Sequence, residues 1–235
     1  MHSLKQTARV AGVLYLGVTI TGILGLIVLP AKLLVPGNAA ASAARILESE
    51  PLYRLYMLDG LVASILFLFV AVALYRLLRD VSSQYAALMV VLVLVMTPLG
   101  ILDTMNQLRA LDLLHGGSLW SAIDRPQREA LAMSLLDPDG RGTSAVMMLW
   151  GLWLFPLAVL VFRSEFLPRF LGVWLWINGL AYVVMSFTGL LWPQYSSTLK
   201  TVLFPAHLGE LVLALWLVIV GARPKRVPEL VLVSP

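Results

Sequence analysis

The residues of this chain that could do chemistry are a few carboxyl, amide and imidazole side chains inside long apolar stretches. The clearest stretch is FPAHLGELVLALWL, residues 204–217, in which Glu210 follows His207 by one helical turn. A carboxylate inside a membrane costs about 2.5–3.5 kcal/mol on insertion scales, so it is expected to face other helices or a wet cavity. Glu210 is therefore the first candidate for acid–base chemistry or for ligand binding.

Further polar side chains fall at comparable places in other apolar stretches. The spacing of Asp103, Asn106 and Gln107 puts these three on one face of a helix. At a rise of about 1.5 Å per residue, Asp59 and Asp103 should lie in the outer half of the bilayer and Asn178 near its centre, level with Glu210. The candidate catalytic residues are Glu210, Asp59 and Asp103, and the candidate ligand-binding residues are His207, Asn106, Gln107 and Asn178.

A structural interpretation of the same residues stays open. Polar side chains in membrane spans also form hydrogen bonds between helices, which contribute about 0.6 kcal/mol on average. For His207 this would be a hydrogen bond within its own helix to Glu210. The stripe of Gly12, Tyr15 and Thr19 in the first span is interpreted as a helix-packing surface and not as part of a ligand site.

Membrane-spanning helices must position all of these groups. Of the 235 residues 60% are hydrophobic and 13% are charged, and the mean hydropathy is +0.88, whereas a soluble domain is nearer half apolar and a quarter charged. A span needs about 20 mostly apolar residues. We therefore predict an all-α, polytopic bundle in one membrane domain, residues 1–235, with spans at about 10–30, 52–76, 83–108, 142–162, 169–192 and 201–221.

Three prolines fall inside the predicted spans. A proline within a helix removes one backbone hydrogen bond and kinks the axis. We expect Pro156 to break the fourth span. Pro98 and Pro205 precede polar candidates and would widen a pocket beside them.

Composition excludes several kinds of site. The chain has no cysteine, which removes disulfides, thiolate metal sites and cysteine nucleophiles. It has three histidines, His2, His115 and His207, too few to predict paired haem ligands on facing spans. We expect no metal and no cofactor, no nucleic-acid partner, and as partners membrane lipid and a lipophilic small molecule; nothing indicates an oligomeric state.

Orientation follows from the basic residues, which concentrate on the cytoplasmic side of membrane proteins. One set of span ends is short and rich in Lys and Arg, whereas the other carries longer loops with nearly balanced charge. We therefore expect a multi-pass protein of the cell membrane with both termini in the cytoplasm and loops 31–51 and 109–141 outside. The basic set is Lys5, Arg9, Arg76, Arg79, Arg163, Arg169, Arg223, Lys225 and Arg226.

The outer loops contain two helix-start signals. Asn38 and Asp124 are residue types that cap helix N-termini, and Pro126 suits a first helical turn. We predict short extracytoplasmic helices over residues 38–49 and 124–135, either as loop surface or as a lid over an outward-facing pocket.

Several stretches resemble a known family. The segments ARVAGVLYLGVTITGILG, ALYRLL, WGLWLFPL and GELVLALWL are similar to the bacterial six-span membrane family catalogued as domain of unknown function 4386. The resemblance covers nearly the whole chain and implies the fold and a membrane location. It implies no reaction and no functional residues.

Three functions fit these observations. The first is a membrane protein with a polar intramembrane pocket, open towards the extracytoplasmic side, that binds a lipophilic small molecule. The second is an intramembrane acid–base enzyme, of a cyclase or isomerase type, acting on a lipophilic substrate. The third is a proton-coupled transporter, for which we find no internal three-plus-three repeat of the kind common in such folds.

Overall fold

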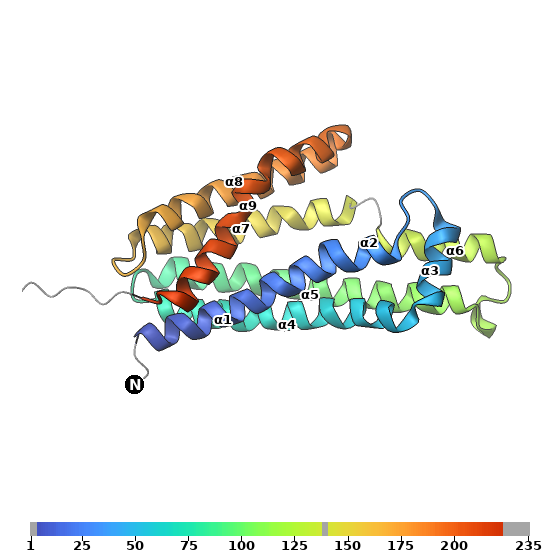
Figure 1. Ribbon diagram of the computed structural model, residues 1–235, viewed down its shortest axis with the longest axis horizontal. Coiled ribbons are helices and arrows are strands. Elements are labelled where there is room, and N and C mark those ends of the chain that lie inside the picture. Colours follow the sequence, from blue (N-terminus) through green and yellow to red (C-terminus); the bar gives the residue numbers. More distant parts are fainter. Residues whose placement is uncertain (1–3, 138–140, 223–235) are drawn as a thin grey trace, which may run out of the picture.

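The computed structural model describes residues 4–137 and 141–222, in which all regular structure is helical (Figure 1). In this part of the chain six helical segments are long and apolar enough to cross a membrane, which confirms the predicted bundle. The first is formed by α1 (Leu4–Ile23), the π-turn η1 (Leu24–Val28) and α2 (Leu29–Leu33). The others are α4 (Glu50–Leu78), α5 (Ser83–His115), α7 (Arg141–Arg163), α8 (Arg169–Leu191) and α9 (Ser196–Ile219).

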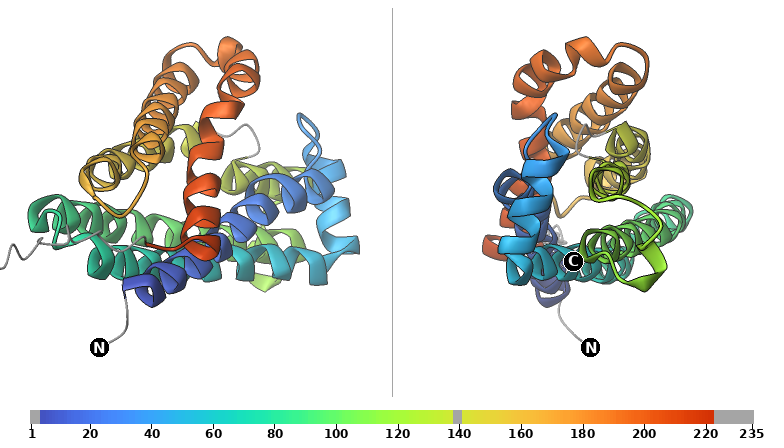
Figure 2. Two further views of the ribbon diagram at one scale, coloured as in Figure 1. Left: turned by 60° about the vertical axis from the view of Figure 1, so that its left-hand side comes forward. Right: turned by 90° about the vertical axis from the view of Figure 1, so that its right-hand side faces the viewer.

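The six spans are arranged as a ring. Going round it, α1 packs on α4, α4 on α5, α5 on α7, α7 on α8, α8 on α9, and α9 returns to α1. Figure 2 shows α8 and the beginning of α9 on the side away from α4, and the end of α9 beside α1. The described chain begins and ends at the same end of the bundle, where α1 starts and α9 finishes (Figure 1). The neighbours of α9 are therefore α1 and α8, on opposite sides of it.

The main hydrophobic core joins all six spans. Trp153 of α7 is 1% exposed in it. Its ring lies 4.8 Å from the Phe67 ring of α4 and 5.9 Å from the Tyr15 ring of α1. These aromatic contacts connect three helices that are distant in sequence.

Two short helices form a second core at the other end of the bundle. They are α3 (Ala39–Glu48) and α6 (Arg125–Leu136), and the side chains of Asn38 and Asp124 cap them by accepting from the backbone N–H of Ala41 and Gln127. Their apolar faces pack on each other and on the ends of α4 and α5, burying residues such as Ile46 and Tyr53. The two predicted loop helices are confirmed; a movement that opens or closes a pocket stays a prediction.

The prolines do not end their helices. Pro98, Pro156 and Pro205 lie inside the continuous helices α5, α7 and α9, so the expected break at Pro156 is wrong. Helix α7 is held by close packing along α8. A Cβ atom at Gly151 would lie 2.7 Å from the carbonyl oxygen of Gly179, so the two backbones approach directly.

The first span departs from a regular α-helix, which was not predicted. Pro30 has no N–H for the carbonyl four residues earlier, and its ring crowds that carbonyl. The π-turn η1 immediately precedes this position and widens the helix by one residue. The span then continues as α2 to Leu33.

Candidate functional site

The Glu210 carboxyl group on α9 is hydrogen-bonded to both neighbouring spans. The Tyr15 hydroxyl on α1 donates to Oε1 at 2.7 Å. On α8, Asn178 Nδ2 and the Tyr182 hydroxyl each donate to Oε2 at 3.3 Å. One side chain of α9 therefore ties together α1, α8 and α9.

Asn178 extends this network to His207. Since its Nδ2 faces Glu210, its Oδ1 faces the imidazole, and His207 Nδ1 lies 2.9 Å from that oxygen. An amide oxygen only accepts, so Nδ1 donates. The other ring nitrogen, Nε2, lies 3.0 Å from Met185 Sδ. Asn178 is 0% exposed, and its two ends join the carboxyl and imidazole groups of α9.

Glycines beside the polar residues permit these short contacts. Gly12 lies one turn before Tyr15, and a Cβ there would come within 2.8 Å of Val218 N on α9. Gly209 precedes Glu210, and a Cβ there would lie 3.0 Å from Trp174 Cδ1 on α8. Helix α9 can therefore approach both neighbours closely at the level of its carboxyl group.

Aromatic rings surround the polar centre. The Tyr182 ring lies 4.3 Å from the His207 ring and 5.8 Å from the Trp150 ring. Tyr15 is 2% exposed and packs against Trp153. Glu210 and His207 themselves keep part of their surface exposed. The site is a carboxyl group held by three donors and flanked by aromatic rings, on a residue that is itself partly exposed.

The donor pattern defines what the carboxyl group can still do. A carboxylate offers about four acceptor positions. The contacts from Tyr15, Asn178 and Tyr182 use three of them, one on Oε1 and two on Oε2. One acceptor position on Oε1 is left for a further donor.

Asp59 and Asp103 belong to a second group, on α4 and α5. Asp103 Oδ2 accepts from Gln107 Nε2 at 2.8 Å, and Gln107 is 2% exposed. The Tyr53 hydroxyl of α4 donates to the Gln107 carbonyl at 2.8 Å. Asp59 is 8% exposed and lies against η1, where a Cβ at Gly25 would be 2.5 Å from its Oδ2. This group fastens α4 to α5 and to the first span.

The structure therefore separates candidates that the sequence had placed together. Asn178, which was expected level with Glu210, contacts it, whereas Asp59 and Asp103 lie in the other group. The polar residues of α5 could bond to Glu210 only if α5 lay beside α9, but α5 packs between α4 and α7. These residues are Asp103, Gln107 and the half-buried Asn106.

Of the alternatives left open for His207, the structure does not show the hydrogen bond to Glu210 within α9. Both ring nitrogens of His207 face α8, where Nδ1 contacts Asn178 and Nε2 contacts Met185. The catalytic and ligand-binding roles assigned to the candidate residues stay predictions.

Sequence analysis missed Tyr15, Tyr182 and Met185. Tyr15 was assigned to helix packing because it shares a stripe with Gly12. Tyr182 lies four residues after Asn178, on the same helix face, and this spacing was a usable signal. Met185 is apolar and gave none.

Among the described residues no group of three or more His, Cys, Asp or Glu side chains is placed to hold a metal ion. The side chains at the site are one carboxyl, one imidazole, one amide and two phenols. This set suits hydrogen bonding to an organic molecule.

Comparison with known protein families gives a match over most of the chain. A family model described as "Domain of unknown function (DUF4386)" matches residues 10–221. No curated protein and no solved structure matches the chain significantly.

Proposed function

The chain belongs to the DUF4386 family, whose description assigns no activity, so we propose a function from the site. We propose that the protein is an integral protein of the cell membrane and binds a lipophilic small molecule at Glu210. The observation that carries this proposal is the arrangement of donors around the carboxyl group. Three donors from α1 and α8 hold it in place, while the Glu210 residue keeps part of its surface exposed.

The open acceptor position selects the kind of ligand. A molecule that binds there must donate a hydrogen bond, as an alcohol or an amine does. The rest of the molecule must be apolar, since the walls are the rings of Tyr182 and Trp150 and the site lies within a membrane span. A long-chain alcohol has both properties.

The amide of Asn178 favours binding over proton transfer between Glu210 and His207. An amide that donates to one group and accepts from the other passes a proton only by becoming its unstable imidic tautomer. Asn178 therefore holds the two titratable groups in position. This supports a binding site more than the relay that a proton-coupled transporter would need.

Orientation is part of the proposal. Basic residues clearly outnumber acidic ones at the end where the described chain begins and ends, which carries Lys5, Arg9, Arg76, Arg79, Arg163 and Arg169. The carboxylates nearby are Asp80 and Glu165. Positive charge is concentrated in cytoplasmic segments, so this end faces the cytoplasm, as do both termini. Arg223, Lys225 and Arg226, used in the sequence argument, lie outside the described residues.

Photo-crosslinking of the purified protein with a diazirine derivative of hexadecanol tests the ligand site. We expect labelled peptides from α1, α8 and α9, and competition by unmodified hexadecanol. The Glu210→Gln variant should lower the affinity about tenfold, because a hydrogen bond to a charged group contributes about 1.5–3 kcal/mol.

The matched control is Glu165→Gln, which makes the same chemical change in the exposed α7–α8 connection. It should label like the wild type. Equal labelling of wild type and Glu210→Gln, or competition by hexadecane as strong as by hexadecanol, would overturn the proposal.

A further inference from the structure

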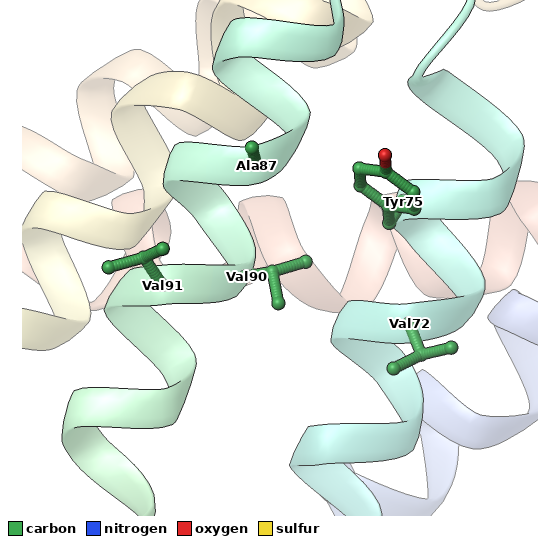
Figure 3. Close-up of a pocket in the computed structure, with 5 residues that line it drawn as sticks. All are labelled: Val72, Tyr75, Ala87, Val90 and Val91. Atoms are coloured by element: carbon green, nitrogen blue, oxygen red, sulfur yellow. The ribbon is translucent and has the colours of Figure 1, made fainter.

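An apolar groove lies between α4 and α5, away from Glu210 (Figure 3). Its volume is about 250 Å³, and its walls are Val72, Tyr75, Ala87, Val90 and Val91. We propose that this groove holds part of one acyl chain of an anionic phospholipid, and that Arg76 and Arg79 bind the phosphate of the same lipid.

The α4 wall of the groove leads directly to the two arginines. Residues four apart on a helix lie one above the other. Arg76 therefore follows Val72 on the same face, and Arg79 follows Tyr75. Both arginines are exposed. An apolar wall that ends in two cations matches a lipid, in which a hydrocarbon chain ends in a charged group.

The α5 wall ends in polar groups that suit the same ligand. One turn before Ala87 lie Ser83 and Gln84, both exposed. They are the first two residues of α5, whose first turn contains no acidic residue. A hydroxyl, an amide and the free N–H groups of this turn can donate to a phosphate.

The local charge favours an anion. The one acidic residue in the α4–α5 connection is Asp80, and its Oδ1 lies 3.8 Å from Arg79 Nε. The exposed fractions of the two side chains are 57% and 93%, so solvent weakens this pair. Arg76 adds a second positive charge one turn away. Basic residues near a membrane surface attract anionic lipids.

The position and size of the groove fit one hydrocarbon chain. Val72, Ala87 and Val91 are exposed on the outer side of the ring, and the groove lies within two membrane-spanning helices. Figure 3 shows Val90 directed towards α4, where it forms the floor between the helices.

Native mass spectrometry of the detergent-purified protein tests the proposal with two lipids, phosphatidylglycerol and phosphatidylcholine, that carry the same acyl chains. The wild type should bind phosphatidylglycerol about tenfold more tightly. The double variant Arg76→Gln/Arg79→Gln should lose this preference. Ala87→Phe fills the mouth of the groove and should lower the binding of both lipids several-fold.

The matched control is Lys5→Gln/Arg9→Gln, which removes the same charge from exposed positions at the same end of the bundle. It should bind both lipids like the wild type. Equal affinity of the wild type for the two lipids, or an equal loss in the control, would overturn the proposal. A dimer that Ala87→Phe dissociates would assign the groove to a second copy and also overturn it.

The melting temperature of each variant shows whether it is folded. If Ala87→Phe is unfolded, Ala87→Leu is the milder variant that blocks the groove. Glu210→Gln should leave phosphatidylglycerol binding unchanged. The proposals for the lipid groove and for the Glu210 site are therefore tested independently.

Discussion

At the residue scale, the structure explains how a carboxyl group is kept in the apolar part of a helix. Burying an unpartnered charge is far too costly to be tolerated, so buried carboxylates are hydrogen-bonded or paired. Glu210 has three donors, and the shortest contact, at 2.7 Å, comes from Tyr15. The Tyr182 contact is longer, at 3.3 Å, and shares its acceptor oxygen with Asn178. The two phenols should therefore contribute unequally.

We predict that Tyr15→Phe destabilises the protein more than Tyr182→Phe does. Removing the Tyr15 hydroxyl leaves Oε1 of Glu210 without its donor, at a cost of about 1–3 kcal/mol. Removing the Tyr182 hydroxyl leaves Oε2 with Asn178, and the cost should be below about 1 kcal/mol. Thermal unfolding in detergent should show a drop of several degrees for Tyr15→Phe and a smaller drop for Tyr182→Phe.

A matched comparison is Tyr75→Phe, which removes a phenol hydroxyl from α4, far from Glu210. It should melt like the wild type. A larger effect for Tyr182→Phe than for Tyr15→Phe would contradict the assigned geometry.

At the element scale, the position of Glu210 depends on the crossing of α1 and α9. Gly12 lies in this crossing, where a Cβ would come within 2.8 Å of Leu217 Cβ and Val218 N. Gly22 lies further along α1, and a Cβ there would meet nothing within 4 Å. The same helix thus provides a test position and a control.

We predict that Gly12→Ala lowers stability by about 1–3 kcal/mol, the range for an extra methyl group in a tightly packed contact. It should also weaken hexadecanol binding, because it moves α1 and Tyr15 away from α9. Gly22→Ala should be neutral or slightly stabilising, since alanine favours a helix over glycine. Melting curves and crosslinking yields measure both, and equal behaviour of the two variants would contradict the packing described here.

The spans themselves could be predicted from the sequence, because their length and hydropathy follow directly from the bilayer. Asn38 and Asp124 likewise predicted the starts of α3 and α6, because they are residue types that cap helices. The contacts of Glu210 could not be predicted, because they depend on which helices are neighbours. Hydropathy does not encode that order, so the sequence could not show that α5 packs on α4 and α7 and not on α9. Tyr15 was missed because a phenol beside a glycine suits packing and hydrogen bonding equally well.

At the scale of the whole molecule, the ring of six spans has two different ends. One end carries the described beginning and end of the chain, and its basic residues outnumber its acidic ones. The other carries α3, α6 and a second hydrophobic core. This asymmetry supports the proposed orientation, with both termini in the cytoplasm.

We predict that a cysteine at Gln127, exposed on α6, reacts with a membrane-impermeant maleimide in intact cells. A cysteine at Asp80, in the α4–α5 connection, should react only after permeabilisation. The chain has no cysteine of its own, so each variant reports a single position. Labelling of Asp80→Cys but not of Gln127→Cys in intact cells would reverse the orientation.

The central claim is that Glu210 keeps an acceptor position for a lipophilic donor. An infrared difference spectrum of the membrane-reconstituted protein, recorded on adding hexadecanol, tests it most directly because it observes the carboxyl group itself. The account predicts a shifted carboxyl band in the wild type, no such shift in Glu210→Gln, and no shift on adding hexadecane. The same carboxyl shift in Glu210→Gln, or an unchanged spectrum of the wild type with hexadecanol bound, would contradict it.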